Sequence, residues 1–122
     1  MKIIQADRVI VGEDNKILEN GVVVIEGSLI RYVGQAKEAV ERYPEAVLEK
    51  KENCTLLPGL IDMHVHPGHW SRRPDAKEIG ENLGHITLIA YKNLQDALSV
   101  GITTIRAVGE PFGLGSALRA GF

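Results

Sequence analysis

The chain has 122 residues, enough for one small domain with a modest core but too few for a large barrel. Its hydrophobic content of 44% and charged content of 25% are ordinary for a globular protein. A net charge of −2 and an aromatic content of 5% argue against nucleic acid or an anionic membrane as partner.

Cysteine usage and hydropathy indicate a cytoplasmic protein without a membrane partner. Cys54 is the only cysteine, so an intramolecular disulfide is impossible, which fits a reducing compartment. Charged residues interrupt the first eight positions too early for a signal peptide. No apolar run approaches the roughly 20 residues that span a bilayer. We expect Cys54 to be buried rather than nucleophilic.

The first part of the chain, residues 1–57, has the pattern of short β-strands. Its β-branched runs favour extended structure, and a turn at Glu26-Gly27-Ser28 joins two of them into a hairpin. The charged run at 49–53 has mixed sign and is typical of a solvated loop. We predict strands or extended pieces at 2–11, 21–25, 29–33, 47–48 and 55–57, and a short helix at 36–42. This part is expected to form a small β-sheet or half of a sandwich.

From residue 58 to 122 the pattern changes to strand, helix, strand. Residues 60–66 predict a strand that Pro67 ends, because proline cannot donate to a continuing ladder. An amphipathic helix, clearest over 86–99, follows from apolar residues at steps of three and four, namely Ile79, Leu83, Ile86, Ala90, Leu94 and Ala97. Gly101 stops this helix, residues 102–108 form a second strand, and a Gly/Pro loop leads to a further helix from Ser116. Strands joined in this way are parallel.

The candidate chemistry lies at the end of the first of these strands. Side chains alternate along a strand, so His64 and His66 point to the same face, which Asp62 shares. Imidazole is a common ligand of zinc and similar divalent ions, and two imidazoles on one face can converge on one ion. Asp62 could orient them without touching the metal. On spacing alone, however, a hydrogen-bonded histidine pair with no ligand is the favoured interpretation.

The residues around the two histidines favour a metal site over a histidine pair that has no ligand. The stretch from Leu57 to His66, Leu-Pro-Gly-Leu-Ile-Asp-Met-His-Val-His, resembles the Pro-Gly-x-Ile-Asp-x-His-x-His signature of the amidohydrolase superfamily. The opening strands are similar to the small β-sandwich of that superfamily, and residues 93–106 resemble its second barrel strand with the preceding helix. The combination is most similar to the imidazolonepropionase-like and prolidase-like branch.

The resemblance implies an α/β architecture, in which part of a composite small β-sandwich precedes the first strand-helix-strand of a TIM (β/α)₈ barrel. It implies one or two divalent ions, most simply zinc, with His64 and His66 as the first two ligands. A metal-activated water would hydrolyse an amide-like C–N bond of a small molecule: a non-peptide amide, a cyclic amide or a dipeptide-like compound. Since such a barrel takes about 250 residues, we expect an N-terminal part that is inactive alone, needs the missing C-terminal portion and forms a homo-oligomer. No catalytic residue is assigned within it.

Three more residues are candidates for substrate binding. His69 and Trp70 follow the motif and could lie at the mouth of the site, although solvation of His69 and plain packing of Trp70 are the alternatives. Arg106 could bind a substrate carboxylate through its bidentate fork, but a structural salt bridge is favoured. Many family members have an aspartate after this arginine, where this chain has Ala107, so the subgroup stays open.

Other functions remain open at the level of sequence. Within the enzyme class, a metal-dependent deaminase or a dihydroorotase-like cyclic amidase would share the His-x-His strand. Outside it, the chain could be a non-catalytic, oligomerising relative, or a structural α+β domain whose histidines bind nothing. Metal content separates the enzymes from the structural domain, and molecular mass in solution identifies the oligomer.

Overall fold

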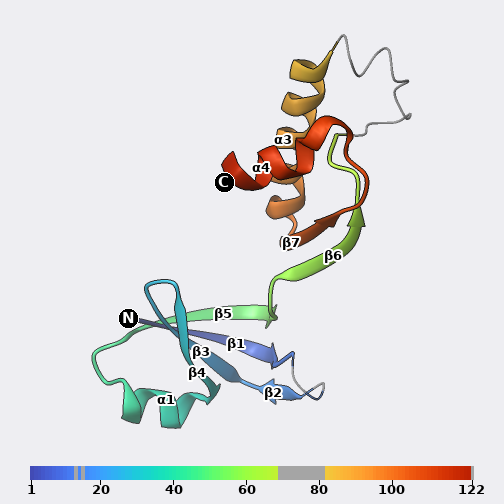
Figure 1. Ribbon diagram of the computed structural model, residues 1–122. Helices are drawn as coiled ribbons and strands as arrows, with labels where there is room; N and C mark the ends of the chain where they lie inside the picture. Colours follow the sequence, from blue (N-terminus) through green and yellow to red (C-terminus); the bar gives the residue numbers. More distant parts are fainter. Residues whose placement is uncertain (13, 15, 69–81, 122) are drawn as a thin grey trace. The chain divides into compact units, whose positions relative to one another are not determined.

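The computed structural model describes residues 1–12, 14, 16–68 and 82–121, which have a mixed α/β fold. The chain divides into two compact units, Met1–Pro58 and Gly59–Phe122 (Figure 1). None of the helices in the described part is long and apolar enough to cross a membrane.

The first unit is a five-stranded sheet with one short helix. Its elements are β1 (Lys2–Ile10), β2 (Ile17–Glu19), β3 (Gly21–Glu26), β4 (Leu29–Gln35), α1 (Ala36–Arg42) and β5 (Val47–Leu56). Strand β1 is central: it pairs antiparallel with β2 and β3 and parallel with β5. The predicted hairpin is confirmed, because β3 and β4 pair antiparallel around Gly27, whose φ is 57°. The predicted bounds of α1 are confirmed as well.

A small apolar core holds this unit together. Ile3, Val22 and Val24 are almost fully buried, and Ala39 of α1 packs among them. Removing these side chains from water is the main favourable contribution to folding of a sheet this small. Tyr32 extends the cluster at its rim and donates a hydrogen bond of 2.7 Å to Glu38. This bond to a carboxylate raises the pKa of the Tyr32 phenol above its ordinary value.

Two predictions about this unit are wrong. The charged run at 49–53 belongs to the ten-residue strand β5 rather than to a loop. Its charged side chains are tolerated because, among the described strands, β5 pairs only with β1, and charge is common on such edge strands. Cys54 lies in this strand and is exposed rather than buried. The three-residue strand β2 was not predicted at all.

The second unit contains β6 (Leu60–Val65), α3 (Leu83–Ser99), β7 (Ile102–Ala107), a 3₁₀ turn η1 (Pro111–Gly113) and α4 (Leu114–Gly121). Strands β6 and β7 pair parallel, which confirms the predicted strand-helix-strand arrangement. Figure 1 shows them side by side, with α3 connecting back to β7. Helix α3 begins at Leu83, three residues before its predicted start, and α4 begins at Leu114 rather than Ser116.

The core of the second unit lies between its two α-helices. Ile86 and Ala90 of α3 and Leu114 of α4 are buried against one another. The helix therefore buries the middle of the apolar face that the spacing of three and four residues predicted, whereas Leu94 and Ala97 are only partly buried and Leu83 is 40% exposed. The apolar face expected for β6 is not covered within the described residues, because Ile61 is 62% and Met63 is 56% exposed.

Candidate metal centre

The two histidines of the motif come together at the carboxyl end of β6. Their ring centroids are 5.4 Å apart, and the rings meet edge to face at 71°. The two side chains differ in exposure: His64 is exposed, whereas the side chain of His66 is 34% exposed. Two imidazoles in this arrangement are suited to share one divalent ion.

Asp62 contacts the strand backbone at the first of the two histidines. Its Oδ1 accepts a hydrogen bond of 3.0 Å from the backbone N–H of His64. The carboxylate thus acts on the main chain of a candidate ligand. Its role in orienting an imidazole remains a prediction.

A carboxylate that the sequence did not single out lies beside His66. Glu110 follows β7, and its side chain is only 3% exposed. Its Oε1 lies 3.8 Å from Nδ1 of His66, and its Oε2 accepts a hydrogen bond of 3.3 Å from the backbone N–H of Gly68. The parallel pairing of β6 and β7 brings these groups together, because the carboxyl ends of parallel strands share one edge of the sheet.

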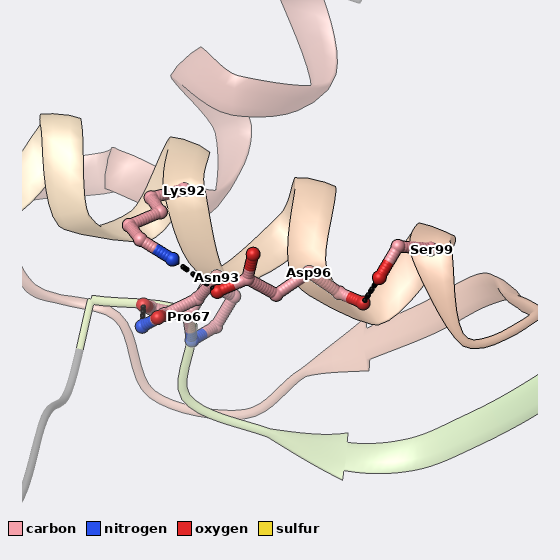
Figure 2. A network of polar contacts seen from close by, with 5 residues as sticks. All are labelled: Pro67, Lys92, Asn93, Asp96 and Ser99. Carbon is pink, nitrogen blue, oxygen red and sulfur yellow. Dashed lines mark hydrogen bonds and ion pairs between the residues drawn. The ribbon is translucent and has the colours of Figure 1, made fainter.

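Helix α3 also supports the turn that follows His66. Figure 2 shows Asn93 reaching from the helix to Pro67, where its Nδ2 donates a hydrogen bond of 2.8 Å to the backbone carbonyl. On the same helix Lys92 pairs with Asp96, and the Ser99 hydroxyl donates to the Asp96 carbonyl oxygen at 2.6 Å. Only the Asn93 contact in this network reaches the turn after β6, and it fixes the backbone next to a candidate ligand.

Of the three residues predicted to bind substrate, the structure describes only Arg106. Arg106 donates from Nε to the backbone carbonyl of Met63 at 2.8 Å, and no carboxylate in the described part of the chain forms an ion pair with it. Within the described residues the guanidinium therefore ties β7 to β6, and the expected salt bridge is not seen there. His69 and Trp70 lie outside the described residues.

The described residues do not by themselves complete a metal site. Within residues 1–12, 14, 16–68 and 82–121, no three His, Cys, Asp or Glu side chains gather closely enough to hold an ion. A groove of about 870 Å³ lies along α3, β7 and α4 and includes Arg106 and Glu110, but the two histidines do not line it. The geometry therefore provides two candidate ligands and one buried carboxylate beside them.

The sequence matches no model of a known protein family, but parts of it are similar to curated enzymes. Over 56 residues it is 41% identical to a probable imidazolonepropionase of Dictyostelium discoideum, which covers 43% of this chain and 13% of that protein. Over 79 residues it is 37% identical to an allantoinase of Saccharomyces cerevisiae, which covers 56% of this chain and 16% of that protein. The chain thus spans less than a fifth of the length of these two relatives.

Two solved structures are similar in fold to this chain over 98% of its length. Aminofutalosine deaminase of Helicobacter pylori has a TM-score of 0.74 at 21% identity, with 33% of that chain covered, a likeness that shows the fold alone. Ochratoxinase of A. niger has a TM-score of 0.67 at 26% identity, with 28% of that chain covered. The motif that ends β6, the curated relatives and the shared fold together point to the amidohydrolase superfamily.

Proposed function

We propose that the chain forms the N-terminal part of a metal-dependent hydrolase that cleaves an amide-like C–N bond of a small molecule. The observation that carries this proposal is the pair of imidazoles at the carboxyl end of β6, with ring centroids 5.4 Å apart. In parallel α/β architectures, ligands and catalytic groups gather at this end of the strands. The first unit would be part of a small β-sandwich, and β6, α3 and β7 the start of a (β/α)₈ barrel.

When bound, one or two divalent ions, most simply zinc, would supply Lewis-acid chemistry, namely a water activated for attack and polarisation of the attacked group. His64 and His66 would hold it through ring nitrogens. Asp62 keeps the strand backbone at His64 in place, and Asn93 does the same for the turn after His66. Further ligands and the group that handles the proton would come from protein outside the described residues.

The relatives support a substrate class. An imidazolonepropionase and an allantoinase among them favour a small cyclic substrate with a C–N bond over a long peptide. Arg106, His69 and Trp70 stay candidates for substrate binding, although the main-chain bond of Arg106 to Met63 favours a structural role for that residue.

We place the protein in the cytoplasm, since one cysteine allows no internal disulfide.

Two variants of the intact protein test the proposal. His64→Ala and His66→Ala each remove one ligand from a site that needs about three. We expect each to lose most of the bound metal and the hydrolysis of cyclic amides. Metal is measured by mass spectrometry of the purified protein, and hydrolysis by loss of ring absorbance.

His85→Ala is the matched control, because it removes an exposed histidine from α3 of the same unit. It should keep both metal and activity. If the wild-type protein held no metal, or if the His64 and His66 variants kept it, the hydrolase proposal would be wrong. Deamination of the ring in place of its opening would support the alternative deaminase.

A non-catalytic role has one observation in its favour. Apolar side chains of the second unit are exposed, among them Ile61 and Met63 on β6 and Leu88 and Leu98 on α3. Such surfaces are suited to association, either with further barrel elements or with another copy of the chain. A metal-free protein with a solution mass of two or more chains would favour this role over the enzyme.

A further inference from the structure

We propose that Glu110 is a positioning residue, whose buried carboxylate holds His66 in the orientation in which it binds the metal ion. This inference rests on the proposed function and deepens it, since it gives the site an orienting group from β7. The residue does not touch the metal in this account. It acts on the ring of His66 and on the backbone of Gly68, in the turn that follows.

The burial of Glu110 is the first reason. Its side chain is 3% exposed, and a carboxylate removed from water is costly unless charge or hydrogen bonds compensate. Oε2 is compensated by the Gly68 N–H at 3.3 Å. Oε1 is buried and accepts no hydrogen bond from any described residue. It faces Nδ1 of His66 at 3.8 Å, an ion-pair distance that is too long for a hydrogen bond.

The chemistry of imidazole is the second reason. The two ring nitrogens divide their tasks: a nitrogen that bears a proton and faces a carboxylate leaves the other one free to bind a metal. Metal-binding histidines commonly have such a carboxylate partner, which fixes both tautomer and ring orientation. Because Nδ1 of His66 faces Glu110 at 3.8 Å, we expect Nε2 to be the ring nitrogen that binds the ion.

The construction of the turn is the third reason. The Glu110 carboxylate binds the backbone at Gly68, two residues after His66, while Asn93 binds the carbonyl of Pro67 between them. One side chain thereby contacts both the ring of His66 and the main chain two residues after it. Asp62 differs, because it accepts a hydrogen bond from the backbone of His64. A general packing role for Glu110 would not require the carboxylate to face the ring.

The test uses Glu110→Gln, which keeps the shape and removes the charge, in the intact protein. The dissociation constant of zinc is measured by competition with a chelator, and the ¹⁵N shifts of the His66 ring report its tautomer in the metal-free protein. We expect zinc binding about 10–100-fold weaker and a loss of the preference for a proton on Nδ1. Asp96→Asn is the matched control, since it removes an exposed carboxylate from the same unit, and it should change neither quantity.

The outcomes separate this inference from the proposed function. If the wild type binds zinc, and Glu110→Gln binds it as tightly with an unchanged His66 tautomer, only the positioning role is overturned. A fall in unfolding free energy without a change in either readout would also overturn it, because that is the result of a purely structural role. If neither protein binds zinc, the proposed function fails, and the positioning role toward a metal fails with it.

Discussion

Gly68 stands where the turn after β6 meets the core of the second unit. A Cβ at this position would lie 2.9 Å from Oε2 of Glu110, 2.9 Å from Cγ2 of Ile86 and 3.1 Å from Cδ2 of Leu114. All three separations are shorter than ordinary van der Waals contact. The absence of a side chain therefore lets the turn approach both the buried carboxylate and the helix core.

Gly68→Ala is expected to lower the free energy of unfolding by about 1–3 kcal/mol, the usual cost of overpacking a well-packed core. It should also weaken metal binding, because the Glu110 carboxylate must move. Urea unfolding of the intact protein measures the first effect.

The control for this substitution is Gly84→Ala in α3. A Cβ there would meet nothing within 4 Å, and alanine is favoured over glycine in a helix by about 0.5–1 kcal/mol. Gly84→Ala should therefore stabilise the protein slightly. Equal effects of the two substitutions would contradict the close approach at Gly68.

At the scale of elements, α3 links the core to the candidate site. One part of its surface buries Ile86 and Ala90, while Asn93 reaches the Pro67 carbonyl (Figure 2). The helix thus holds the turn that follows His66, and it also packs against α4. Its exposed pair of Lys92 and Asp96 reaches neither the core nor the turn.

Asn93→Ala should cost about 1–3 kcal/mol, because the half-buried carbonyl of Pro67 loses its donor. Lys92→Ala, on the next residue of the same helix, should cost less than about 0.5 kcal/mol, since exposed pairs four residues apart contribute little. Denaturant unfolding of both variants gives the comparison. A cost for Lys92→Ala that matched or exceeded the cost for Asn93→Ala would show that the turn does not depend on the helix.

Sequence patterns predicted the elements whose signals are local. The hairpin around Gly27, the helix at 36–42 and the buried face of α3 follow from turn residues and periodicity over a few residues. Strand β5 did not follow, because its 49–53 segment is charged and its extended form depends on pairing with β1, far away in sequence. Helix α3 starts earlier than predicted, since Gly84 weakens helical propensity without preventing the helix.

The same distinction applies to the candidate site. The two-residue spacing predicts that His64 and His66 share a face, and their rings do lie 5.4 Å apart. Glu110 was missed, because its contact with His66 depends on the register of two parallel strands and on the turn after the second one. The available signal was a lone acidic residue just beyond β7, at the edge of the sheet where β6 also ends.

At the scale of the whole molecule, the two units contribute unequally to the proposed chemistry. The candidate ligands and the groups that support them belong to the second unit, Gly59–Phe122, while the first unit is a sheet with its own core. Because the described residues provide two candidate histidine ligands, and catalytic zinc takes about three protein ligands, the intact protein is the form in which the site must be examined.

The most direct measurement is a crystal structure of the intact, metal-loaded protein, with anomalous diffraction recorded on both sides of the zinc absorption edge. We expect an anomalous peak within about 2.0–2.1 Å of one ring nitrogen of His64 and one of His66. For His66, this nitrogen should be Nε2. A peak bound elsewhere, with both imidazoles beyond ligand distance, would contradict the central claim that this histidine pair is the metal-binding part of a hydrolase.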